Sequence, residues 1–143
     1  MWPTLTALLV ASNQLPDIKL IIIFTLGTIL MRSAGCIAND LADQNIDKYV
    51  KRTKNRQLVL KNITNQTAFI FLLSLLALSF FLVLQLNMYT IYLSILACIS
   101  ALIYPFFKRF FMIPQLFLGI AFSLGILLAF AAIQNTITME GWL

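Results

Sequence analysis

The amino-acid sequence predicts an all-α protein, a polytopic bundle of transmembrane helices. Hydrophobic residues make up 61% of the 143 residues, whereas charged residues make up only 10%. A soluble domain usually carries about 25% charged residues. The apolar residues also come in blocks, and most of these reach the length of about 20 residues that a helix needs to cross a bilayer. Both observations exclude an ordinary water-soluble domain.

Five apolar blocks follow one another along the chain. The first is too short to span a bilayer and resembles the end of a helix, so we expect about four spanning helices and a partial first one. The blocks cover about residues 1–11, 18–38, 67–86, 88–107 and 114–133.

Short polar links between the blocks predict how the helices run. LNM (86–88) separates the third and fourth blocks, and so short a link makes these two helices antiparallel. Asn65 and Thr67 are candidate caps for the third helix, because their side chains can accept a hydrogen bond from a backbone N–H.

The basic residues indicate which side of the membrane each loop faces. The net charge is +5, and most lysines and arginines lie in two stretches, 39–64 and 108–113. Loops rich in Lys and Arg tend to be cytoplasmic. We therefore expect both stretches on the cytoplasmic side, and we attribute the basic charge to membrane topology instead of nucleic-acid binding.

Cysteine and histidine usage narrows the chemistry. Cys36 and Cys98 both lie in apolar blocks, where we expect buried thiols and no disulfide. The chain contains no histidine, which excludes a histidine-ligated metal site and a histidine general base.

A ladder of carboxylates follows the second apolar block. Asp40, Asp43 and Asp47 are three of the five acidic residues in the chain. Their spacings of three and four place them on one face of a helix that continues from this block. Like charges on one face repel each other unless a cation lies between them. Since these ligands, with Asn39 beside them, are all oxygens, they favour Mg²⁺ or Mn²⁺ over zinc.

The basic residues after the ladder indicate a phosphate ligand. Mg²⁺ is usually held by one or two carboxylates together with substrate phosphates. Lys51, Arg52 and Arg56 are placed to neutralise the remaining phosphate oxygens. The pattern therefore predicts a site for Mg²⁺ and pyrophosphate, and the alternative is a solvated charged loop of the kind that many membrane proteins carry.

The stretch MRSAGCIANDLADQNIDKYVKRTKNR (31–56) closely resembles the first aspartate-rich motif of the UbiA-type membrane prenyltransferases. The pattern of that family, NDxxDxxxD, is matched in full by Asn39, Asp40, Asp43 and Asp47.

Other motifs resemble one branch of this family, the one that prenylates 4-hydroxybenzoate in ubiquinone biosynthesis. They are RSAGC (32–36), KRTxxR (51–56), YPFFKR (104–109), WPT (2–4) and PQLFLGIAF (114–122). The resemblance therefore runs over essentially the whole chain.

The resemblance implies a fold and a reaction. Members of the family are bundles of about nine transmembrane helices, in which an isoprenyl pyrophosphate binds through Mg²⁺ between two aspartate-rich motifs on the cytoplasmic side. Pyrophosphate leaves, and an electron-rich aromatic carbon attacks the allylic cation. For this chain the implied substrates are polyprenyl pyrophosphate and 4-hydroxybenzoate, the implied cofactor is Mg²⁺, and the implied location is a bacterial inner membrane.

The resemblance also implies roles for individual residues. Asp40, Asp43 and Asp47 would bind the metal and act in catalysis, and Asn39 would help to ligate it. Arg32 would pair with an aspartate or with the carboxylate of 4-hydroxybenzoate. The implied substrate-binding set is Arg32, Asn39, Lys51, Arg52, Arg56, Lys108 and Arg109. For Lys108 and Arg109, a role as topology anchors is the alternative.

One departure from the family pattern matters. No aspartate follows Asp47, and the second aspartate-rich motif of the family lies in the half that this chain lacks. We therefore expect residues 1–143 to be a partial prenyltransferase domain that needs the missing C-terminal half to complete its site and has little or no activity alone.

Three other interpretations compete. The acceptor could be another aromatic compound, such as a naphthoate. The chain could be a non-catalytic membrane subunit or remnant. A CDP-alcohol phosphotransferase is disfavoured, because the DG…AR…G…D…D pattern of those enzymes is absent.

Overall fold

The computed structural model describes residues 1–12, 14–53, 55–107 and 114–135, and within these ranges it contains five helices and no strand. The prediction of an all-α protein with a short first helix is therefore confirmed. The helices are α1 (Trp2–Ser12), α2 (Ile18–Asp47), α3 (Asn65–Val83), α4 (Met88–Phe107) and α5 (Pro114–Gln134).

Helices α2 to α5 are each long and apolar enough to cross a membrane. Only 11% to 29% of the residues in their most apolar windows are buried inside the structure, so most of their apolar side chains lie on the outside. Phe69, Phe81 and Phe122 are among the large side chains exposed in this way. A surface of this kind is stable against lipid or other helices and unstable in water.

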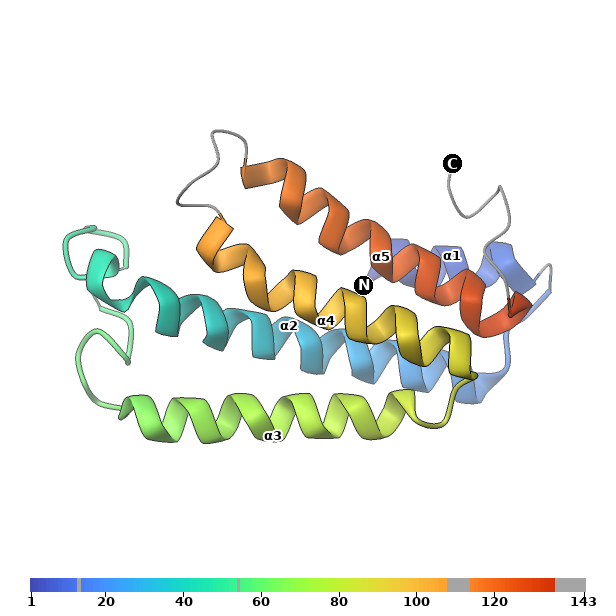
Figure 1. Ribbon diagram of the computed structural model, residues 1–143, viewed down its shortest axis with the longest axis horizontal. Helices are drawn as coiled ribbons and strands as arrows, with labels where there is room; N and C mark the ends of the chain where they lie inside the picture. The colour runs from blue at the N-terminus through green and yellow to red at the C-terminus, as the bar shows by residue number, and fades with distance from the viewer. Residues whose placement is uncertain (13, 54, 108–113, 136–143) are drawn as a thin grey trace.

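The helices run back and forth along the long axis of the molecule, which is horizontal in Figure 1. α3 lies beside α2, and α4 runs antiparallel to α3 after the short turn that joins them. The end of α2, segment 48–64 and the start of α3 therefore lie at the same end of the bundle as the end of α4 and the start of α5. Segment 48–64 and the described residues on either side of stretch 108–113 thus lie at the same end, while 108–113 itself lies outside the described residues.

Two small apolar clusters hold the helices together. One joins α1, α2 and α5 through residues such as Leu8, Phe24 and Phe130, and the other joins α2 and α3 through Ala34 and Leu72. Small residues are typical of such contacts, since they let helix backbones approach closely within a membrane.

Two predictions about single residues are wrong. The cap of α3 is Thr64, whose side chain accepts a hydrogen bond from the backbone N–H of Thr67 at 3.1 Å, so the helix begins before the position expected for a cap at Asn65 or Thr67. Cys36 is exposed instead of buried, and Cys98 is half-buried.

Candidate functional site

The carboxylate ladder lies on the last turns of α2. The helix continues past its apolar part to Asp47, which confirms that Asp40, Asp43 and Asp47 share one helix face. Asp43 and Asp47 are buried, with 7% of each residue exposed, whereas about a third of the Asp40 side chain is exposed, at 34%. A buried carboxylate is stable only when a partner compensates its charge, so the partners of this face decide what the site does.

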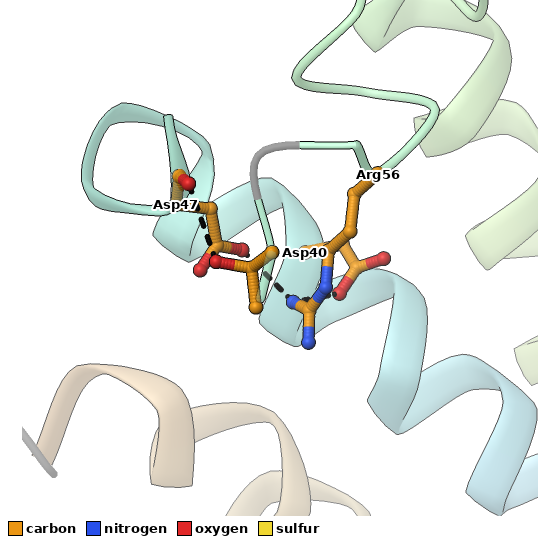
Figure 2. Close-up of polar contacts among 4 residues, drawn as sticks. Asp40, Asp47 and Arg56 are labelled. Atoms are coloured by element: carbon orange, nitrogen blue, oxygen red, sulfur yellow. Dashed lines mark hydrogen bonds and ion pairs between the residues drawn. The ribbon is translucent and has the colours of Figure 1, made fainter. Parts of the chain in front are cut away.

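Arg56 bridges two carboxylates of the ladder. Its Nη1 donates to Asp40 Oδ1 at 2.7 Å and to Asp47 Oδ2 at 2.9 Å (Figure 2). Hydrogen bonds between ionised groups are shorter and stronger than neutral ones. The sequence predicted a divalent cation between these like charges, whereas in the structure the guanidinium of Arg56 contacts two of them.

Segment 48–64 folds back over the end of α2. Gln44 Nε2 donates to the backbone oxygen of Leu58 at 2.9 Å, and Thr53 Oγ1 donates to the backbone oxygen of Asp47 at 3.2 Å. Thr53 and Leu58 are both buried. The segment is therefore held against the last turns of α2, beside the ladder, by hydrogen bonds.

A cavity of about 440 Å³ opens beside the ladder, between α2, segment 48–64 and α3. Asp40 and Arg56 form part of its polar lining, whereas Ile37, Ala68 and Phe71 form an apolar wall. An ion pair and an apolar surface thus meet in one hollow at the end of the helix bundle.

The other described residues of the predicted substrate-binding set lie on α2 and on segment 48–64, outside the ion pairs of Arg56 with Asp40 and Asp47. Lys51 and Arg52 belong to segment 48–64 but are exposed. Arg32 is exposed on α2 and has no ion pair with an aspartate among the described residues. Asn39 is half-buried on the last part of α2. Lys108 and Arg109 lie outside the described residues.

The ladder does not make a metal site by itself. In the described parts of the chain, no three aspartate, glutamate, cysteine or histidine side chains lie close enough to hold one metal ion. The donor set nevertheless fits Mg²⁺, because this ion needs only one or two carboxylates when substrate phosphates supply the other oxygens. Asp40 and Asp47 are two such oxygen donors, and both contact the same nitrogen of Arg56.

Sequence reasoning missed Gln44, Thr53 and Leu58. Gln44 lies inside the aspartate-rich motif, yet its partner is a backbone oxygen 14 positions away in sequence. Every residue has a backbone oxygen, so the sequence does not show which one a side chain will contact. No sequence pattern therefore predicted this hydrogen bond.

Comparisons with known proteins agree on one family. The model of the UbiA prenyltransferase family matches residues 1–143. The chain is 52% identical over 143 residues to 4-hydroxybenzoate octaprenyltransferase from Francisella tularensis subsp. novicida (strain U112), covering 100% of this chain and 50% of that protein. It is 54% identical over 142 residues to the protein of the same name from Herminiimonas arsenicoxydans, covering 99% and 50%. The chain thus spans about half the length of the curated relatives it matches.

A solved structure shares the fold. The apo structure of a UbiA homolog from Aeropyrum pernix K1 superposes with a TM-score of 0.84 and 27% sequence identity, over 98% of this chain and 51% of that one. The helix arrangement, the full-length family match and the carboxylate ladder at the end of α2 all lead to one assignment: the chain belongs to the UbiA prenyltransferase family.

Proposed function

We propose that this chain supplies the pyrophosphate-binding half of a membrane enzyme that transfers a polyprenyl group to the ring of 4-hydroxybenzoate. The observation that carries the proposal is the cluster of Asp40, Asp47 and Arg56 at the end of an apolar helix, beneath a folded segment. The named relatives, which are 4-hydroxybenzoate octaprenyltransferases, support the choice of acceptor, and we place the reaction in ubiquinone biosynthesis on the resemblance of the sequence motifs.

The reaction needs a leaving group to be stabilised. The C1–O bond of polyprenyl pyrophosphate breaks, and its electron pair leaves with pyrophosphate. A ring carbon of 4-hydroxybenzoate then bonds to C1 and the ring loses a proton. Fixed charges placed where negative charge develops lower such a barrier without reorganisation.

The aspartates of the ladder and the basic residues that follow it would stabilise the leaving group in different ways. Asp40, Asp43 and Asp47, with Asn39, would hold Mg²⁺ at the pyrophosphate, directly or through water. The metal would offset the charge of the departing pyrophosphate. Arg56 and the exposed Lys51 and Arg52 would donate hydrogen bonds to phosphate oxygens, a task that suits the guanidinium fork.

The apolar surroundings serve the other end of the substrate. An allylic cation must be kept from water, and an apolar site within a membrane excludes water. Ile37, Ala68 and Phe71 give the cavity beside Asp40 an apolar wall, on which the first isoprene units or the acceptor ring would pack. The long prenyl tail would lie along the apolar outer faces of the helices.

We propose that catalysis uses more than residues 1–143. The relatives are about twice as long, and we propose that the counterpart of their remaining half supplies the second aspartate-rich motif. We place the assembled enzyme in a bacterial inner membrane, with segment 48–64 on the cytoplasmic side.

An assay of the completed enzyme tests this function. The chain is co-expressed with the remaining half of the Herminiimonas arsenicoxydans relative, in membranes that lack an enzyme of their own. We expect prenylated 4-hydroxybenzoate in the presence of Mg²⁺, and a loss of about 100-fold or more in the Asp40→Asn variant. Asn45→Ala, which changes an exposed neighbour on the same helix, is the matched control.

The alternatives predict other results. A naphthoate-type enzyme would prenylate 1,4-dihydroxy-2-naphthoate in preference to 4-hydroxybenzoate. A non-catalytic remnant would give no product with either acceptor, and the proposal would then be wrong.

A further inference from the structure

Residues 57–63, which we call the Lys61 turn, form a closed turn just before α3. Its backbone hydrogen bonds run from Asn62 N to Gln57 O at 3.1 Å and from Lys61 N to Leu58 O at 3.3 Å. Together with a left-handed residue at position 61, this pair of bonds makes the Schellman motif that often ends a helix. Two side chains close the turn further, since Asn62 Nδ2 donates to Gln57 Oε1 at 2.9 Å.

Lys61 occupies a backbone conformation that favours glycine. Its φ angle is 58°, in the left-handed region where a Cβ is unfavourable. Glycine or asparagine is the usual residue at this position of the motif, so the turn does not require a lysine. In the described parts of the chain, the ion pairs belong to Arg56, and the Lys61 ammonium forms none. Neither the backbone nor an ion pair therefore explains the lysine side chain.

Apolar side chains on both sides of Lys61 are exposed. Leu60 is 50% exposed and Ile63 is 41% exposed, whereas Leu58 of the same turn is buried. The turn therefore packs on the protein through one aliphatic side chain and presents two others together with a cation. Such a combination suits the headgroup layer of a membrane, where apolar groups insert and a cation meets lipid phosphate.

The start of α3 places this surface at the membrane boundary. α3 has 19 residues and its cap is Thr64, so the chain enters the helix directly from the turn (Figure 1). A helix of about 20 residues crosses the hydrocarbon core, which is about 30 Å thick. The headgroups bring the total to about 40–45 Å, so each headgroup layer is about 5–8 Å deep. The turn just before α3 therefore lies in a headgroup layer.

We propose that the Lys61 turn is an anchor for anionic phospholipid: Lys61 binds the headgroup phosphate, and Leu60 and Ile63 insert at the boundary between headgroups and acyl chains. Segment 48–64 contains six basic residues and no acidic one, so its charge is complementary to an anionic lipid surface. The closed backbone of the turn limits the conformational freedom that is lost on binding. The anchor holds the end of segment 48–64 at the membrane surface.

Spin-label accessibility tests the depth of the turn. A nitroxide is attached at Leu60→Cys, or at Asn45→Cys on the polar last turns of α2, in a background that lacks Cys36 and Cys98. The chain is reconstituted in nanodiscs of phosphatidylglycerol and phosphatidylcholine in equal parts. We expect the label at 60 to collide more with oxygen, which concentrates in lipid, and the label at 45 to collide more with a water-soluble nickel complex. Equal access of nickel to both labels would overturn the anchor.

The same labels show whether protein covers the turn instead of lipid. The labelled chain is co-expressed with the remaining half of the Herminiimonas arsenicoxydans relative and measured in the same nanodiscs. We expect the label at Leu60→Cys to keep its access to oxygen. Loss of access to both oxygen and nickel would mean that the other half covers this surface, and the anchor would then be wrong.

Native mass spectrometry tests the lipid headgroup. The affinity for phosphatidylglycerol and for phosphatidylcholine is compared between wild type and Lys61→Gln, with Lys48→Gln as the matched control. Lys48 is exposed in the same segment, but its Nζ already lies 4.9 Å from the centroid of the Tyr49 ring. We expect Lys61→Gln to lower the affinity for phosphatidylglycerol about fivefold. Lys48→Gln should match wild type, and the affinity for phosphatidylcholine should not change in either variant.

Two further variants separate the side chain of Lys61 from the backbone. Lys61→Gly suits the left-handed conformation, so its Tm should not fall below that of wild type although it loses the same lipid affinity. Lys61→Arg keeps the charge and should keep the lipid. Three results would overturn the anchor. They are an equal loss in Lys48→Gln and Lys61→Gln, an unchanged affinity in Lys61→Gly, and displacement of the lipid by an equal concentration of soluble glycerol phosphate, which would indicate a site for free phosphate.

Discussion

Gln44 illustrates how one neutral side chain helps to position a charged site. Its amide donates to Leu58 O at 2.9 Å, two residues beyond Arg56, and so fixes the part of segment 48–64 that carries the guanidinium. Asn45, the next residue along α2, is exposed. These neighbours make a matched pair for substitution.

Gln44→Glu should loosen the segment, because a carboxylate facing a backbone oxygen replaces a donor with an acceptor. We expect a local loss of about 1–2 kcal/mol, seen as faster proteolytic cleavage between residues 48 and 64. Asn45→Asp makes the same change in charge at the exposed neighbour and should leave the cleavage rate near that of wild type. Equal rates in both variants would show that the Gln44 contact contributes nothing.

The ladder itself was predictable at the scale of single residues, and its partners were not. Spacings of three and four sufficed to place Asp40, Asp43 and Asp47 on one face, since a helix fixes that relation locally. The position of Arg56 depends on how a loop returns to the helix, which spacing does not determine. The choice of Thr64 as the cap of α3 likewise depends on backbone geometry, because several neighbouring polar residues could have served.

At the scale of elements, a single asparagine joins two helix ends. Asn87 Nδ2 donates to Ala131 O at 2.8 Å and to Ala132 O at 3.2 Å, while its Oδ1 accepts from Thr90 N. The side chain thus caps the start of α4 and also satisfies backbone oxygens in the last turns of α5.

Asn87→Ser should separate these two tasks. Serine can still cap α4 but is too short to bridge to α5, so we expect a loss of about 1–2 kcal/mol and a Tm lower by about 2–6 °C. Thermal unfolding in detergent measures this, with Asn45→Ser as the control. An unchanged Tm would mean that the bridge to α5 does not contribute to stability.

A close approach of α1 to α5 makes a second prediction at this scale. A Cβ at Gly125 would lie 3.3 Å from Thr4 Oγ1, whereas one at Gly119, on the same helix, would meet nothing within 4 Å. Gly125→Leu should therefore push α1 away and lower stability by about 1–3 kcal/mol, whereas Gly119→Leu should not. Comparing the Tm of the two variants checks this, and a similar Tm would contradict the close contact.

The apolar blocks predicted the helices well, because block length and hydropathy are set by the membrane itself. The extension of α2 beyond its apolar part was predictable only from the spacing of the aspartates. Its last turns are polar, so they show no helical repeat of apolar residues. The tie between Asn87 and α5 was not predictable, because it joins residues 44 and 45 positions apart through backbone oxygens.

At the scale of the whole molecule, the alternating direction of successive helices predicts which loops share one side of the membrane. Segment 48–64 and the turn between α3 and α4 lie at opposite ends of the bundle (Figure 1). In a background that lacks Cys36 and Cys98, an impermeant maleimide should label Lys61→Cys only in inverted vesicles and Gln85→Cys only in intact spheroplasts. Labelling of both from the same side would contradict the assigned orientation.

The central claim is that the carboxylate end of α2, beneath segment 48–64, binds pyrophosphate through a divalent cation. The most direct measurement is the Tm of the detergent-solubilised chain with inorganic pyrophosphate, with and without Mg²⁺. At a pyrophosphate concentration of about ten times Kd, binding should stabilise the fold by about 1.4 kcal/mol, which raises Tm by about 2–5 °C. We predict this rise only with Mg²⁺ and its absence in the Asp40→Ala/Asp43→Ala double variant. The same rise without metal, or in the double variant, would contradict the account.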